Sequence, residues 1–248
     1  MKDATELGFN RTGVQTSPLA LHIMQTYADE QTSMPPAAAD GMPDGKAIAA
    51  VRSAYVLEAD GVGSVPMPGT LTGAFNTVIS KLRGQKPEVL VDKLGERLGF
   101  ERSGVRLYQA LIDKTEALAG RVTLPFTPDD LRHIRDEELE HMHIVASALD
   151  SLGADSSAQT PSADVAAVAN GGVMQVMTDP RTTISQCLEA MLSAELLDSA
   201  CWALLIRLSK EADQDALLPQ FQRALKRENE HVTRVKGWLE TMLLGEMG

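Results

Sequence analysis

The chain has 248 residues, of which 44% are hydrophobic and 23% charged, values typical of a globular protein with one large or two small domains. Its net charge of −11 and its pI of about 4.9 argue against nucleic acid as a partner, because an acidic surface repels phosphates but not cations. No apolar run approaches the roughly 18 residues of a membrane span. The first residues also lack the apolar core of an export signal.

The two cysteines agree with a cytoplasmic location. Cys187 and Cys201 fall on one predicted helix, where a rise of about 1.5 Å per residue separates them by roughly 21 Å. That distance is too great for a disulfide, so both thiols are expected to be free. A reducing compartment is the simplest setting for free thiols. We therefore expect a cytoplasmic protein that binds neither nucleic acid nor membrane.

Residues 1–86 are predicted to form a largely irregular N-terminal extension. Two segments rich in Pro, Gly and Ala, 31–43 and 59–68, carry no sustained helical period. Residues 46–58, between them, fit a short helix or a strand equally well, and residues 70–82 predict a short amphipathic helix. An arm of this kind can wrap the following domain or clasp a second copy of the chain. A homodimer is therefore expected.

Residues 87–248 are predicted to form an all-α domain, because apolar residues recur there at the three- and four-residue spacing of amphipathic helices. Capping residues, prolines and glycines set the expected helix ends. Four long helices are expected: 87–118, one from the N-cap Thr127 to Gly153, one opening at Asp179-Pro180, and one beginning near Asp213 or Pro219.

The connections between these helices predict a four-helix bundle. The links at about 119–126 and 212–214 are short, and short links make neighbouring helices antiparallel. Between the second and third helices lie 25 residues, 154–178, which are enough to run the length of a bundle. This long crossover contains a candidate short helix at 163–177.

Ionisable residues occupy core positions in the apolar stripes of the four helices. On the first helix the predicted core positions are Leu94, Leu98, Glu101, Val105, Tyr108 and Ile112. A lone ionised carboxylate in a core is costly unless it is paired or binds a metal. Each Glu-x-x-His pair places a carboxylate and an imidazole one turn apart on one helical face, within reach of a common ion. The candidate metal ligands are Glu101, Glu138, His141, Glu195, Glu228 and His231.

The ligand pattern also repeats along the chain. The segment from Glu101 matches the segment from Glu195, with an aromatic residue seven positions later in each, and Glu138-x-x-His matches Glu228-x-x-His. The two glutamates are 37 residues apart in the first half and 33 in the second. A two-fold-related pair of helical hairpins would bring one Glu and one Glu-x-x-His from each half to the centre, which is the ligand set of dimetal bundles.

On these motifs, the chain from about Pro87 to Leu244 resembles the ferritin-like superfamily, which includes ferritins, rubrerythrins, manganese catalases and carboxylate-bridged di-iron oxidases. The resemblance implies two transition-metal ions, iron or manganese, bridged by Glu138 and Glu228. It also implies that Glu101 and His141 serve one ion, and that Glu195 and His231 serve the other. The cysteine pairs of the rubrerythrin iron site are absent.

Three functions remain open from the sequence. The favoured one is a redox enzyme that reacts with dioxygen or hydrogen peroxide; the others are an iron-oxidising or iron-storage protein, and a scaffold with incidental metal. Helical phase favours His141 over His143 as a ligand. Asp198 fits either a residue that orients a ligand imidazole or a plain hydrogen bond elsewhere. Tyr108 and Trp202 fit core filling or a redox role, and Gly104 fits close packing or room for a substrate.

Overall fold

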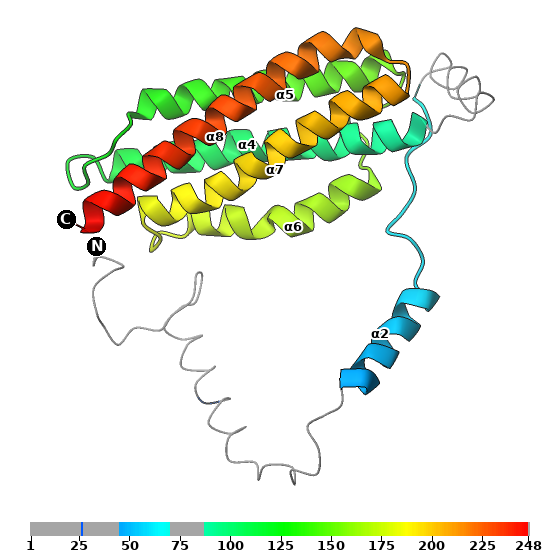
Figure 1. Cartoon of the computed structure of the whole chain (residues 1–248), viewed down its shortest axis with the longest axis horizontal. Coiled ribbons are helices and arrows are strands. Elements are labelled where there is room, and N and C mark those ends of the chain that lie inside the picture. Colours follow the sequence, from blue (N-terminus) through cyan, green and yellow to red (C-terminus); the bar gives the residue numbers. More distant parts are fainter. Residues whose placement is uncertain (1–25, 27–44, 70–86, 248) are drawn as a thin grey trace. The chain divides into compact units, whose positions relative to one another are not determined.

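The computed structural model describes Thr26, residues 45–69 and residues 87–247, and all regular structure within them is helical (Figure 1). None of the helices in these ranges is long and apolar enough to cross a membrane. The predicted amphipathic helix at 70–82 and most of the predicted irregular arm lie outside the described residues.

Residues 46–58, for which the sequence left helix and strand open, lie in helix α2 (Gly45–Glu58). Its apolar side chains are exposed: Ile48 is 51% exposed, Tyr55 69% and Leu57 86%. Helix α2 belongs to a compact unit of its own, separate from the unit that contains the remaining helices. Residues 59–69, which follow it, contain no helix, as predicted.

The four predicted long helices and the predicted crossover helix are all present. They are α4 (Pro87–Ala117), α5 (Pro128–Ser151), α6 (Pro161–Thr178), α7 (Ile184–Glu211) and α8 (Leu218–Met247), with a short 3-10 turn, η1 (Asp215–Leu217), before α8. Helix α4 packs closely along α5, and α7 packs closely along α8. Helix α6 lies along α4 and α7, away from α5 (Figure 1).

Side-chain caps fix where α5 and α7 begin. At α5, Thr127 is the N-cap, as predicted, and it forms a reciprocal capping box with Asp130. The predicted start of α7 at Asp179-Pro180 is wrong, because the capping box there is formed by Thr183 and Gln186. Asp179 instead ends α6, with its backbone N–H donating to Gln175 O, and Pro180 follows that helix end, where proline is common.

The core consists of two apolar clusters at opposite ends of the helices, with a polar layer between them. The first cluster includes Leu111, Ile134, Leu188, Met191 and Val235. The second cluster includes Leu94, Leu98, Val145, Trp202 and Phe221. Most predicted core positions are buried, but Val105 is only half-buried. Leu107 and Leu111 are buried on α4 although the pattern did not select them. Helix α6 covers the face of α4 that carries Leu107.

Both cysteines are free thiols, as their predicted separation required.

Candidate metal centre

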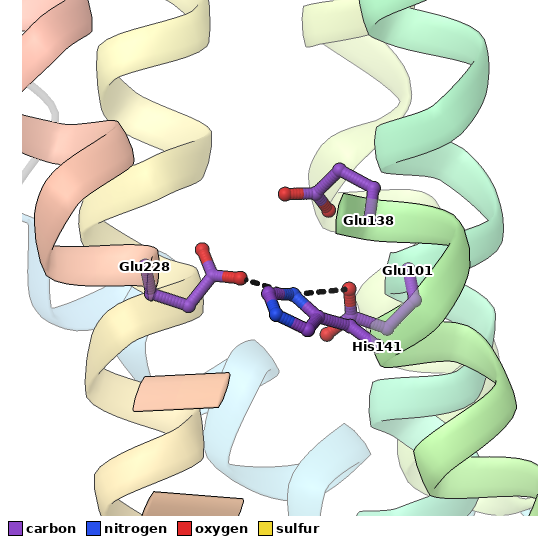
Figure 2. A group of neighbouring side chains, drawn as sticks. All are labelled: Glu101, Glu138, His141 and Glu228. Atoms are coloured by element: carbon purple, nitrogen blue, oxygen red, sulfur yellow. Dashed lines mark ion pairs between the residues drawn. The ribbon is translucent and has the colours of Figure 1, made fainter. Parts of the chain in front are cut away.

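All six predicted ligands lie in the polar layer between the two apolar clusters. Each is at most 3% exposed, and they project from the four long helices α4, α5, α7 and α8. Figure 2 shows one group, in which Glu101, Glu138 and Glu228 surround His141. His143, which helical phase placed off the core stripe, is exposed. The periodicity argument therefore identified the correct face of α5.

The six side chains form two groups that share two members. Glu101, Glu138, His141 and Glu228 offer ligand atoms that all lie within 4.8 Å of one another, and so do Glu138, Glu195, Glu228 and His231. Glu138 and Glu228 belong to both groups. The remaining four residues divide into one Glu and one His for each group. This division has the same membership as the two ligand sets implied by the resemblance.

Close contacts link the two imidazoles to the carboxylates. His141 Nδ1 lies 2.6 Å from Glu228 Oε1 and 3.9 Å from Glu101 Oε2. His231 Nδ1 lies 3.2 Å from Glu138 Oε1, 3.5 Å from Glu228 Oε2 and 3.6 Å from Glu195 Oε2. In both halves, Nδ1 is therefore the ring nitrogen that faces the carboxylates.

Gly104 provides space for the Glu138 carboxylate. A Cβ at this position would lie 2.4 Å from Glu138 Oε2, which is closer than non-bonded atoms approach. Of the two roles that the sequence left open for Gly104, the structure supports close packing. The small residue allows a shared carboxylate to lie against the backbone of α4.

Many polar atoms of the centre are buried without a hydrogen-bond partner. Buried polar side-chain atoms in proteins nearly always have one, so each exception needs an explanation. Among the described residues, the atoms in this layer that make no hydrogen bond are Glu101 Oε2, Glu138 Oε1, both nitrogens of His141, Glu195 Oε2, both oxygens of Glu228, His231 Nδ1 and Arg97 Nε. Several of the carboxylate and imidazole atoms lie close to one another without forming a hydrogen bond. Every one of the six residues contributes at least one such atom. A cation could bind the carboxylate oxygens among these atoms and one nitrogen of each imidazole.

Two aromatic residues hold the two glutamates that belong to only one group each, and both hydrogen bonds join α4 to α7. Tyr108 on α4 donates to Glu195 Oε1 on α7, and Trp202 Nε1 on α7 donates to Glu101 Oε1 on α4, at 3.0 Å for the tryptophan. Both rings are fully buried. Each bond uses one carboxylate oxygen and leaves the other directed at the centre. Sequence spacing selected both residues, but it could not show that their polar atoms hold a glutamate of the other half.

A buried ion pair that the sequence did not reveal lies beside Glu101. Arg97 Nη1 lies 2.7 Å from Asp198 Oδ1, and Arg97 Nε lies 3.4 Å from Glu101 Oε1. Asp198 thus pairs with a guanidinium, and the alternative in which it orients a ligand imidazole is wrong. Arg97 is one helical turn before Glu101 and is only 2% exposed. The one available signal was its four-residue spacing from a predicted ligand.

Glu137 is a further residue that the sequence did not single out. Its Oε2 lies 2.9 Å from His231 Nε2, so it holds the ring with Nδ1 directed at the carboxylates. A carboxylate on the outer nitrogen of a ligand imidazole fixes the ring orientation and raises its basicity. Glu137 precedes the predicted ligand Glu138 on α5, and the pairing with His231 depends on the approach of α8.

The centre carries a large excess of negative charge. Five carboxylates are buried around it, against one buried guanidinium, that of Arg97: Glu101, Glu138, Glu195, Asp198 and Glu228. With neutral imidazoles this leaves four formal negative charges, which two divalent cations would neutralise. Uncompensated buried charge is strongly unfavourable, so without cations the centre must bind protons instead.

The pKa values agree with proton uptake at this centre. Burial raises the pKa of Glu195 from 4.5 to about 8, and burial also raises the pKa values of Glu101 and Asp198. Burial alone would lower the pKa of His231, but the surrounding carboxylates outweigh it and raise that pKa. Burial raises the pKa of Glu228, whereas the two imidazoles together bring it down to about 2.

Metal-free protein should lose thermal stability as the pH rises from about 5 to 8. A carboxyl group with a raised pKa stabilises the fold below its ordinary pKa of 4.5, and this contribution is lost as the pH rises through its folded pKa of about 8. His231, with its raised pKa, acts in the same sense above 6.5. Glu228 acts in the opposite sense, but only between pH 2 and 4.5. Circular dichroism melts at pH 5.5 and 8 with chelator measure this effect.

Saturating Mn²⁺ should reduce or reverse this loss of thermal stability at high pH. The ion takes the place of the protons at the carboxylates, and it binds more tightly as those protons dissociate. A metal-free protein that melts at a higher temperature at pH 8 than at pH 5.5 would contradict this assignment.

A scan against models of protein families, a search of curated proteins and a search of solved structures each find no match to this chain.

Proposed function

We propose that residues 87–248 form a ferritin-like four-helix bundle that binds two transition-metal ions, iron or manganese, and reacts with dioxygen or hydrogen peroxide. The observation that carries the proposal is the pair of ligand groups sharing Glu138 and Glu228, with unpartnered donor atoms in every member. A scaffold with incidental metal would leave this buried charge without a role.

The donor set favours iron or manganese over zinc. Mixed carboxylate and imidazole donors suit both metals, whereas structural zinc sites are usually tetrahedral and rich in cysteine. Neither Cys187 nor Cys201 is a member of the two ligand groups. Four glutamates match the charge of two divalent ions, and neutral imidazoles add donors without adding charge.

Each ligand takes the role that its group membership supports. Glu138 and Glu228 would hold both ions, Glu101 and His141 would hold one, and Glu195 and His231 would hold the other. When bound, the metal pair would supply the electrons for reduction of the oxidant. The protein side chains bind and orient: Tyr108 and Trp202 each hold an outer carboxylate by one oxygen. The two apolar clusters exclude water, which strengthens the electrostatics of the centre.

The redox part of the proposal is tested by stopped-flow absorbance. Anaerobic, reduced protein loaded with iron or manganese is mixed with dioxygen or hydrogen peroxide, and the rate is compared with that of the same metal free in buffer. We expect a faster reaction with the protein, and loss of the acceleration in Glu138→Ala, which removes a shared ligand. Wild-type protein that binds metal but reacts no faster than free metal would exclude the redox function and favour the scaffold alternative.

A further inference from the structure

The helices around the polar layer cover some of its sides more completely than others. Helices α4 and α5 pack closely, as do α7 and α8, and α6 covers α4 and α7 (Figure 1). The two apolar clusters fill both ends. Helices α5 and α8, in contrast, share few contacts, and no other helix of the described ranges packs on both of them. The seam between α5 and α8 is therefore the least enclosed approach to the centre.

A chain of charged side chains crosses this seam beside His231. Arg227 on α8 reaches α5, where its Nε lies 3.3 Å from Glu137 Oε1 and its Nη1 donates to Glu140. The other oxygen of Glu137 lies 2.9 Å from His231 Nε2. The Glu137 side chain is 17% exposed and that of Arg227 37%, whereas that of His231 is 1% exposed. Glu137 is thus in contact with both the solvent-facing arginine and a buried ligand.

Among the described residues, the side of the centre between α4 and α7 differs from this seam. Between α4 and α7, the Arg97–Asp198 pair is almost completely buried and places a cation beside Glu101. At the α5–α8 seam the groups nearest the centre are carboxylates, which attract a divalent cation. The arginine that pairs with them is held at the surface and has the opposite effect.

We propose that a hydrated divalent cation enters the centre between α5 and α8, where Arg227 acts as a latch and Glu137 passes the ion to the ligands beside His231. This inference rests on the proposed dimetal function and adds the route and its control. When Arg227 leaves Glu137 and Glu140, two carboxylates become available to the incoming ion. When it returns, its positive charge opposes both entry and escape. The latch therefore controls the rates of uptake and release more than the affinity.

The test uses the full-length, metal-free protein and Co²⁺, whose absorbance reports ligand binding. Uptake is followed by stopped flow, and release is followed after mixing the loaded protein with excess EDTA. Arg227→Met removes the latch, and we expect uptake and release each to become about tenfold faster, within the range of electrostatic effects on association. The equilibrium affinity should change much less. Glu140→Gln frees only one arm of the arginine and should accelerate both rates by a smaller factor.

Lys226→Met is the matched control, because it removes the same charge from the neighbouring residue. The side chain of Lys226 is 80% exposed, and its Nζ lies 3.7 Å from Glu230 Oε1. Neither residue belongs to the centre. Lys226→Met should leave both rates within about twofold of wild type, since a charge this exposed is largely screened. Equal acceleration by both variants would overturn the latch in favour of a general charge effect.

Wild-type protein that binds two ions while Arg227→Met binds and releases them at the wild-type rate would overturn the entry route alone. Wild-type protein that binds no Co²⁺ would overturn the dimetal function together with the route. Circular dichroism establishes that each variant is folded, as expected for replacements at exposed or half-exposed positions.

Discussion

Replacement of Glu228 by alanine should abolish tight binding of both metal ions, although it removes only one of six ligands. Glu228 is a member of both ligand groups, and neither of its oxygens has a hydrogen-bond partner. Both imidazoles contact it. Loss of a residue outside the ligand set costs about 10- to 100-fold in metal affinity. Loss of a shared ligand should exceed that for each ion.

Variants at unshared and exposed positions give the comparison. Glu101→Ala and His141→Ala should weaken the binding of one ion and leave the other bound. Glu195→Ala and His231→Ala should weaken the binding of the second ion in the same way. His143→Ala, at an exposed position one turn from Glu140, should bind two ions normally. Isothermal titration with Mn²⁺ measures stoichiometry and affinity together. If Glu228→Ala keeps two tight sites, or if His143→Ala loses metal while His141→Ala keeps it, the ligand assignment is wrong.

Among the single variants, Arg97→Met should lower the free energy of unfolding the most. Arg97 is 2% exposed, and its removal leaves Asp198 buried without its partner and Glu101 without its neighbouring cation. Removal of one partner from a buried ion pair costs about 3–5 kcal/mol. The guanidinium also lies 4.0 Å from the centre of the Phe100 ring, a contact that the variant loses as well. In a domain of this size the melting temperature should fall by about 10 °C.

A second variant separates lost charge pairing from lost packing. Arg97→Met combined with Asp198→Leu replaces both charges by apolar groups of similar size, which in buried pairs is often neutral or stabilising. Most of the lost stability should return in this double variant. Urea unfolding of the metal-free proteins measures the three free energies. A single variant as stable as wild type, or a double variant as unstable as the single one, would contradict the role assigned to this pair.

The burial of the six candidate ligands could be predicted from sequence because the helices are long and the period is strong. A carboxylate or imidazole that recurs in phase with leucines must face the core, and two halves with the same order of residues strengthen the pattern. Glu101 and Glu195 were identified in this way, and both are buried. The phase also separated His141 from His143, two residues apart on one helix.

Residues whose role depends on a neighbouring helix could not be predicted. Arg97 lies one helical turn before Glu101, and Glu137 lies directly before Glu138, but their partners come from α7 and α8. The cross-helix bonds of Tyr108 and Trp202 likewise require the packing of α4 on α7. Local spacing contains no information about which face of a distant helix will approach. The same limit explains why the pattern missed Leu107, which α6 helps to bury.

The start of α7 was misjudged for a local reason. Two capping signals lie four residues apart, Asp179-Pro180 and Thr183 with Gln186, and either can begin a helix. The structure uses the second, while the first ends α6 and supports Arg181 through the Asp179 carboxylate. At the next helix, Asp213 and Pro219 were both candidates. Helix α8 begins at Leu218 with Pro219 in its first turn, and the backbone at Asp213 has a φ of 56°.

The measurement that tests the dimetal proposal most directly is the metal content of folded protein. Metal-free chain is loaded with iron under anaerobic conditions, or with manganese, then separated from free metal by gel filtration and analysed for metal and protein. The proposal predicts about two ions per chain for wild type and close to none for Glu228→Ala. A wild-type value near zero, with circular dichroism showing an intact helical fold, would contradict it.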